Sequence, residues 1–144
     1  MKVIALRGEP NCGKTEALRI VHNKMLDKGF TQVFNKYKDL GNTDFLDILE
    51  FNGNVIGIVS QGDYAHSAGE AVSVKRHLEM LKQEGVDIAI CACSTGAAKE
   101  KIKKAIDDYQ GQYIDKKKAE SDYGKENHLF AELVVNQLLN LLAK

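Results

Sequence analysis

The chain has 144 residues, of which 44% are hydrophobic and 28% are charged. This length fits one domain over residues 1–144, large enough to bury roughly two thirds of the surface that the unfolded chain exposes. Lysines and arginines number 20, as do aspartates and glutamates, so no global basic field draws the chain to nucleic acid or to anionic membranes.

Two further absences narrow the class of protein. No segment approaches the roughly 18 consecutive apolar residues of a membrane-spanning helix, and the N-terminal apolar run ends at Arg7, too early for a signal peptide. The sequence has 3 cysteines and no paired cysteine framework, which is typical of a reducing compartment. We therefore expect a cytoplasmic protein with no membrane partner.

The first third of the chain predicts a strand, a helix and a shorter strand. Residues 3–7 begin with four apolar residues, two of them β-branched, and are followed by Gly8, which indicates a buried strand. From residue 14 to about residue 27, apolar side chains recur at helical spacing, which predicts a helix, and Gly29 is a signal for its C-terminal end. Residues 31–34 are expected to form a short strand, and the polar residues 36–43 a loop.

A hairpin follows over residues 44–60. The segment DFLDILEF alternates apolar with acidic residues, which is typical of an exposed or edge strand. Asn52-Gly53-Asn54 is a turn signal, and the next segment, VIGIVS, is nearly continuously apolar, as expected for a strand buried on both faces.

The second half of the chain continues the alternation of helices and strands. Strands that alternate with helices favour a parallel sheet with helices on both faces. We expect an α/β fold, a three-layer sandwich of about five or six mostly parallel strands with one antiparallel strand from the hairpin. The remaining predicted elements are helix 67–84, strand 86–92, helix 97–109, strand 112–114 and helix 122–142.

The join between the first strand and the first helix carries a phosphate-binding pattern. Residues 8–15 read GEPNCGKT and match G-x-x-x-x-G-K-[ST] in the required context, after a strand and before a helix. The glycines let backbone N–H groups approach a polyphosphate, and the helix start adds unpaired N–H groups and a positive dipole end. Lys14 would reach the β- and γ-phosphates, and the Thr15 hydroxyl would coordinate Mg²⁺. An ordinary tight turn is the alternative.

Through this motif the chain resembles the P-loop NTPases, and its α/β layout resembles theirs more loosely. The resemblance implies a P-loop NTPase fold that binds a nucleoside triphosphate together with Mg²⁺, with ATP as the favoured nucleotide. The residues then expected to bind the nucleotide are Gly8, Glu9, Pro10, Asn11, Cys12, Gly13, Lys14, Thr15 and Glu16.

The acidic residue that P-loop NTPases usually place after a second buried strand is missing from its expected position. Here that strand ends at Ser60, and the nearest acid that follows is Asp63. The metal ligands expected from the resemblance are Thr15, Ser60 (through a bound water) and Asp63. The expected catalytic residues are Lys14, which would stabilise charge on the transferred phosphoryl group, and Asp63, which would arrange the metal; Asp63 and Glu9 are candidates to position a water.

Three functions fit this motif. The first is ATP hydrolysis, alone or with a partner protein. The second is transfer of the γ-phosphate to a small-molecule acceptor, as in the small nucleotide kinases, which requires a second pocket beside the phosphates. The third is a non-catalytic nucleotide-dependent switch. The order of elements also resembles the small GTPases, but the D-x-x-G and N-K-x-D patterns are absent, which disfavours guanine specificity.

The other conspicuous groups have simpler structural interpretations. Cys12 is expected to be a small filler in the loop, with a redox switch as the less favoured alternative, and Cys91 and Cys93 are expected to pack in the core. The basic cluster at residues 115–118 is expected to be a surface charge run rather than a nucleotide contact. The leucines of the last helix are expected to pack on the sheet, and any left over would provide a dimer face.

Overall fold

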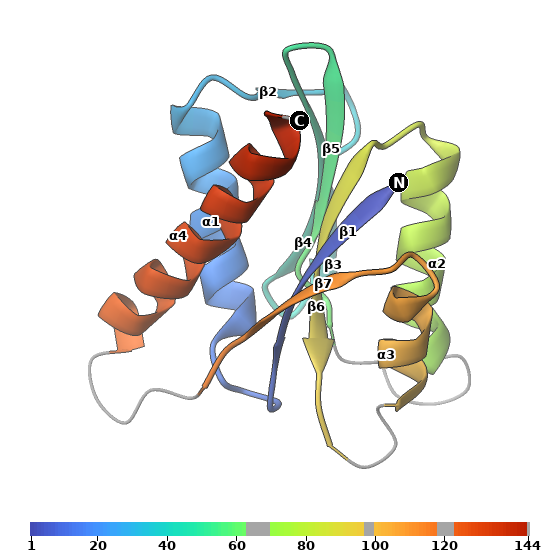
Figure 1. The fold of residues 1–144 in the computed structure, drawn as a ribbon, viewed down its shortest axis with the longest axis vertical. Coiled ribbons are helices and arrows are strands. Elements are labelled where there is room, and N and C mark those ends of the chain that lie inside the picture. The colour runs from blue at the N-terminus through green and yellow to red at the C-terminus, as the bar shows by residue number, and fades with distance from the viewer. Residues whose placement is uncertain (63–69, 97–99, 118–122, 144) are drawn as a thin grey trace.

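The protein is a three-layer α/β sandwich, shown in Figure 1 as a computed structural model. The structure describes residues 1–62, 70–96, 100–117 and 123–143. Helices α1 and α4 cover one face of a single sheet, and α2 and α3 cover the other. The elements are β1 (Lys2–Gly8), α1 (Lys14–Asp27), β2 (Thr31–Gln32), β3 (Lys38–Gly41), β4 (Asp44–Phe51), β5 (Asn54–Val59), α2 (Glu70–Gln83), β6 (Ile88–Ser94), α3 (Glu100–Asp107), β7 (Gln112–Asp115) and α4 (Tyr123–Leu142).

The sheet is mixed, with one strand reversed. Its order is β2-β4-β5-β6-β1-β7, and β3 pairs with β4 as well. Strand β4 is antiparallel to β2, β3 and β5, whereas β5, β6, β1 and β7 pair in parallel. The predicted α/β sandwich with one antiparallel strand from a hairpin is therefore confirmed, although the described residues form seven strands in this sheet rather than five or six.

The edge of the sheet beyond the hairpin differs from the prediction. The predicted loop over residues 36–43 contains strand β3, and β2 and β3 both pair with β4, so β4 is not an edge strand. Phe45, Leu46, Ile48 and Leu49 of β4 are all buried. The polar sequence of β3 gave no strand pattern, because its pairing depends on the backbone of β4 rather than on an apolar face of its own.

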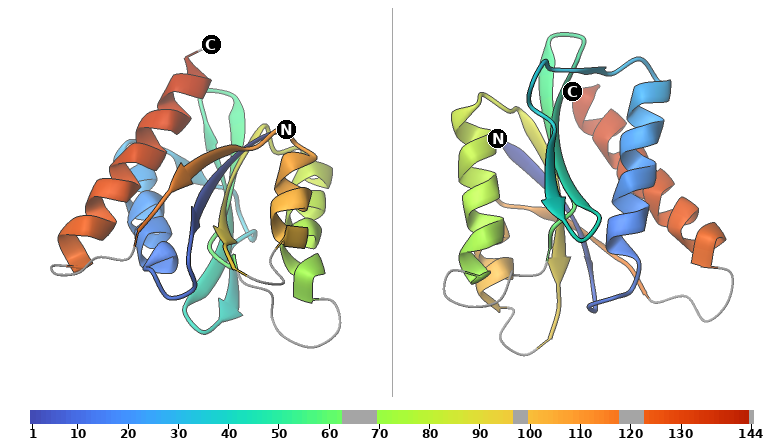
Figure 2. Two further views of the ribbon diagram at one scale, coloured as in Figure 1. Left: turned by 60° about the horizontal axis from the view of Figure 1, so that its bottom comes forward. Right: turned by 180° about the vertical axis from the view of Figure 1, so that it is seen from behind.

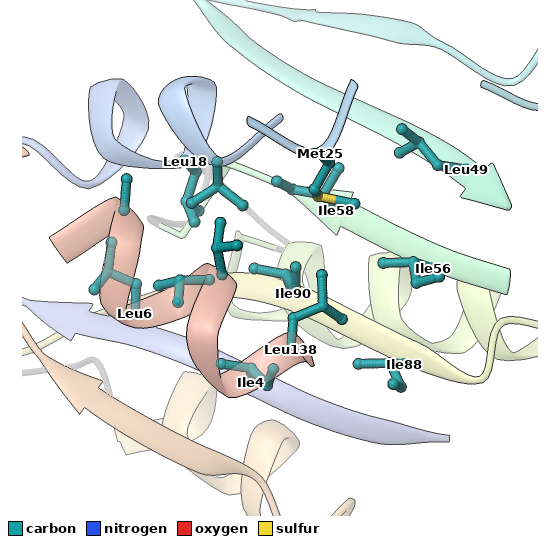
Figure 3. Close-up of a cluster of buried hydrophobic side chains, with 14 of the residues drawn as sticks. Ile4, Leu6, Leu18, Met25, Leu49, Ile56, Ile58, Ile88, Ile90 and Leu138 are labelled. Atoms are coloured by element: carbon teal, nitrogen blue, oxygen red, sulfur yellow. The ribbon is translucent and has the colours of Figure 1, made fainter. Parts of the chain in front are cut away.

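Two apolar clusters hold the layers together. Figure 3 shows the first, in which Ile4 and Ile90 of the sheet meet Leu18 of α1 and Leu138 of α4. The second lies on the opposite face, where α2 and α3 pack on β1, β4, β5 and β6. Fully burying one such side chain contributes roughly 1.5–3 kcal/mol. None of the described helices is both long and apolar enough to cross a lipid bilayer.

The predicted core cysteines lie in the second cluster. Cys91 and Cys93 are both buried and unpaired, which confirms that they pack in the core. Burial raises the pKa of the Cys93 thiol to about 11. That thiol is therefore protonated at neutral pH, and a protonated thiol is a poor nucleophile and a poor metal ligand.

One buried polar network joins the helix and the strand that begin at the same edge of the sheet. The Asp47 side chain is fully buried in β4, and its Oδ2 lies 2.8 Å from Nε2 of His22 in α1. Gln32 Nε2 donates to the same oxygen at 2.7 Å, and the Ile48 N–H donates to Oδ1 at 2.8 Å. This carboxylate fixes the position of α1 relative to β4.

The network yields a prediction about stability. Asp47→Ala leaves the buried His22 and the exposed Gln32 without their acceptor, and we expect it to lower the free energy of unfolding by about 3 kcal/mol. Urea titration followed by circular dichroism measures this change. Glu50→Ala, at an exposed position of the same strand, is the matched control and should change stability by no more than about 0.5 kcal/mol. Equal effects of the two substitutions would contradict the assigned network.

Candidate functional site

A cavity of about 850 Å³ opens where β1 and β5 end, within the size range of small-molecule sites. Four segments form its wall: the loop after β1 with the start of α1, the turn between β3 and β4, the end of β5, and the start of α4. The lining residues are Pro10, Asn11, Cys12, Gly13, Lys14, Thr15, Glu16, Leu40, Asn42, Thr43, Asp44, Ser60, Gln61, Gly62, Tyr123 and Asn127.

The loop after β1 has a conformation that requires its glycines. Gly13 precedes α1 with φ of 97°, and a Cβ there would lie 2.5 Å from the Asn127 side-chain oxygen. A Cβ on Gly8 would lie 2.6 Å from the carbonyl oxygen of Lys116. No side chain caps the start of α1, so its first N–H groups are left for another acceptor.

Lys14 is a buried cation folded onto its own loop. Lys14 is only 6% exposed, and its Nζ donates to the carbonyl oxygens of Gly8 at 3.1 Å and Glu9 at 2.8 Å. None of the ion pairs among the described residues includes Lys14. Because burying a charge without a counter-charge is costly, this arrangement favours an anion beside the loop.

Lys116 is a second buried cation at the same loop. It is 3% exposed, its Nζ donates to the Cys12 carbonyl at 2.7 Å, and the ammonium lies 5.2 Å from the ring centroid of Phe130. The predicted surface charge run is therefore wrong at this residue, although Lys117 is exposed. The reason is strand pairing: β7 lies beside β1, so the chain leaves β7 directly behind the loop, with the Lys116 N–H bonded to the Arg7 carbonyl at 2.7 Å.

An aspartate that sequence reasoning missed joins two of the expected metal ligands. Thr15 Oγ1 donates to Asp44 Oδ1 at 3.1 Å, and Ser60 Oγ donates to the same oxygen at 2.9 Å. The Phe45 N–H donates to Ser60 Oγ at 2.9 Å and fixes the hydroxyl. The register of the predicted hairpin was the signal that could have identified Asp44. In an antiparallel pair the first residue of one strand lies beside the end of its partner, which brings Asp44 next to Ser60.

The other predicted site residues divide into three groups. Gly8 and Glu9 supply the carbonyls that hold Lys14, while residues 10–16 line the cavity. Cys12 is buried, with its sulfur 3.8 Å from Lys14 Nζ. Asp63 lies outside the described residues.

Within the parts of the chain that the structure describes, no three His, Cys, Asp or Glu side chains cluster as a metal site. Mg²⁺ is typically bound by one or two carboxylates together with phosphate oxygens and waters, so a dedicated protein cage is not needed. Asp44 and Thr15 are oxygen donors of the required kind.

Comparisons with known proteins identify no family for this chain. No family model and no curated protein matches the chain. Among solved structures, the crystal structure of APE1195 is similar with a TM-score of 0.43 and 14% sequence identity, over 96% of this chain and 74% of that chain. Neither a family nor a function follows from a likeness at this level.

The position of Lys116 behind the loop can be tested with inorganic triphosphate. Wild-type protein should gain thermal stability when this anion is added, and Lys116→Met should lose at least half of that gain. The methionine keeps the packing against Phe130 but releases the Cys12 carbonyl and removes a cation near the loop. Differential scanning fluorimetry measures both melting curves.

Lys117→Met is the matched control, because it removes the same charge from the exposed neighbouring position. It should keep the full gain. Without ligand, Lys116→Met should lower the free energy of unfolding by no more than about 3 kcal/mol, because the Cys12 carbonyl loses its donor while the cost of burying a charge is removed. An undiminished triphosphate shift in Lys116→Met would contradict the contribution of this lysine.

Proposed function

We propose that the chain is a P-loop NTPase that binds a nucleoside triphosphate and Mg²⁺ in the cavity at the end of β1. ATP is the favoured nucleotide. The observation that carries this proposal is the buried Lys14 ammonium, which bonds two carbonyls and the Cys12 sulfur of a G-x-x-x-x-G-K-[ST] loop and lines a cavity of about 850 Å³. It pairs with no carboxylate among the described residues. The three free, buried cysteines fit a cytoplasmic location.

The phosphate end of the ligand would lie against the loop. Uncapped N–H groups at the start of α1 would donate hydrogen bonds to phosphate oxygens, and the positive end of the helix dipole would favour the negative charge of those oxygens. The Lys14 Nζ would exchange its bonds to the Gly8 and Glu9 carbonyls for bonds to the phosphates. A phosphate oxygen carries a negative charge that a carbonyl oxygen lacks, and its attraction to the ammonium favours this exchange.

Asp44 and Thr15 would hold the metal, and Ser60 would keep the carboxylate in place. The donor set fits because the Asp44 carboxylate already accepts from both hydroxyls, so its oxygen and that of Thr15 lie together at the cavity wall. When bound, Mg²⁺ would neutralise charge on the phosphates. Asp44 would thus be the carboxylate ligand of the metal, a role for which the sequence offered only Ser60 and Asp63.

The reaction favoured by this arrangement is hydrolysis. A water oxygen would bond to the γ-phosphorus while the bond from that phosphorus to the β,γ-bridging oxygen breaks, giving ADP and inorganic phosphate with release of a proton. Lys14 would stabilise the charge that develops on the phosphoryl oxygens and on the leaving group. The chain's own contribution is therefore chiefly electrostatic and positional.

Transfer to a small-molecule acceptor is the second candidate. The observation in its favour is that the cavity extends past the loop to Leu40, Asn42 and Thr43 at the β3–β4 turn. A panel of small alcohols and nucleosides with γ-labelled ATP separates the candidates: a labelled organic product indicates a kinase, and labelled inorganic phosphate indicates hydrolysis. Tight binding with neither product indicates a non-catalytic switch.

The phosphate part of the proposal predicts the effect of removing Lys14. Lys14→Ala should weaken ATP binding by about 10–100-fold, the equivalent of 1.5–3 kcal/mol for a hydrogen bond to a charged group. Isothermal titration calorimetry measures the affinity. Lys28→Ala, at the exposed end of α1, should bind as wild type does. Equal affinity of Lys14→Ala and wild type would overturn the proposal.

The metal part predicts a loss of magnesium dependence. Wild-type affinity for ATP should fall when EDTA replaces Mg²⁺, whereas Asp44→Asn should bind ATP nearly equally with and without Mg²⁺. The amide keeps the shape and accepts from Thr15 and Ser60 but is a poor ligand for a hard cation. Asp39→Asn, on the neighbouring strand β3, is the control and should retain the wild-type ratio. A full magnesium effect in Asp44→Asn would rule out this carboxylate as a ligand.

A further inference from the structure

We propose that Gln61, held in place by His77, donates a hydrogen bond to the terminal phosphoryl group and lets the cavity distinguish a nucleoside triphosphate from a diphosphate. This inference rests on the proposed function and adds a specificity-determining residue to it. It stands on one contact that neither the loop motif nor the metal ligands require.

That contact joins the end of β5 to the middle of α2. His77 Nε2 lies 2.8 Å from the side-chain oxygen Oε1 of Gln61, and Gln61 lines the cavity. Burial, with a smaller effect of the Lys38 ammonium, lowers the pKa of His77 from its ordinary value of 6.5, while Asp44 acts in the opposite direction. The imidazole is neutral at neutral pH, and its single N–H donates to the Gln61 carbonyl.

This hydrogen bond decides which end of the Gln61 amide meets a ligand. With Oε1 engaged by His77, the amide nitrogen is the end left for the cavity, and none of the hydrogen bonds found among the described residues uses it. An amide nitrogen carries two N–H donors and no acceptor. Gln61 therefore presents donors, which suit an anion.

The neighbouring contacts place those donors at the metal end of the cavity. Gln61 follows Ser60, whose hydroxyl shares the Asp44 oxygen with the hydroxyl of Thr15. In the proposed function, Thr15 and Lys14 hold the last two phosphates, so the group nearest Gln61 is the terminal phosphoryl group. A diphosphate lacks that group and would leave the donors of Gln61 without a partner.

Substitutions at Gln61 test the inference by comparing two ligands. The full chain is titrated with Mg²⁺ and either ADP or a non-hydrolysable ATP analogue. Gln61→Leu should weaken binding of the triphosphate analogue about tenfold and leave ADP affinity unchanged. Gln61→Glu keeps an acceptor for His77 but turns an anionic oxygen toward the phosphate, so it should weaken triphosphate binding further. Gln83→Leu, at an exposed position near the end of α2, should change neither affinity.

Substitutions at His77 test whether it acts through Gln61. His77→Leu should weaken triphosphate binding about threefold, and His77→Gln, which restores an N–H donor, should recover most of that loss. In a Gln61→Leu background, His77→Leu should add nothing, whereas a merely structural histidine would weaken both nucleotides in either background. Thermal melts identify any variant that fails to fold, and Gln61→Glu then serves in place of Gln61→Leu.

The outcomes separate this inference from the function on which it rests. If wild type binds both nucleotides and Gln61→Leu weakens both equally or neither, the inference is wrong and the proposed function stands. If wild type binds neither nucleotide, both fall. A loss confined to the triphosphate, with rescue by His77→Gln, supports the discrimination.

Discussion

Two buried ammonium groups share one loop, and the rest of the site depends on them. Lys14 bonds the Gly8 and Glu9 carbonyls from the side of the cavity, and Lys116 bonds the Cys12 carbonyl from behind. Because the two ammonium groups bond these three carbonyl oxygens, the carbonyls are not left as free acceptors facing the cavity. The described residues contain no ion pair that includes either lysine, so an anionic ligand would supply the missing counter-charge.

The single reversed strand supplies the opposing wall. Because β4 runs against β5, it begins at the edge where the parallel strands end, and its first residue, Asp44, reaches Thr15 and Ser60. The buried pair of His22 and Asp47 then fixes β4 against α1, the helix that starts at the loop. Figure 2 shows both elements from behind, with the start of α1 and the start of β4 toward the same end of the molecule. A carboxylate is thus held near a cationic loop without neutralising it.

Sequence patterns predicted the parts of the fold that depend on local signals. The helix from Lys14 to Asp27 follows from apolar periodicity, and the hairpin from its alternation and turn residues. The strand β3 was missed because its polar residues pair with a neighbour instead of burying a face of their own. The motif singled out Gly8 and Gly13, and the structure gives both positions a conformation or a close contact that a larger residue would not fit. Its assignment to phosphate binding stays a prediction.

The remaining site residues depend on long-range pairing, which one sequence does not display. Asp44 acquires its place through the register of β4 with β5, and Lys116 through the pairing of β7 with β1. Both had looked like ordinary charges, one in an alternating strand and one in a basic run. Gln61 is distinguished only by its contact with His77, 16 positions away. Burial and partners, rather than residue type, separate these side chains from their neighbours.

The central claim is that backbone N–H groups at the start of α1 bind the phosphates. Amide NMR of the ¹⁵N-labelled chain, titrated with Mg²⁺ and a non-hydrolysable ATP analogue, tests it most directly. The account predicts that the largest shifts fall on the amides of Gly13, Lys14 and Thr15, because N–H groups that gain a charged acceptor move strongly. Saturable binding that leaves these three amides unshifted, with the changes gathered elsewhere on the molecule, would contradict it.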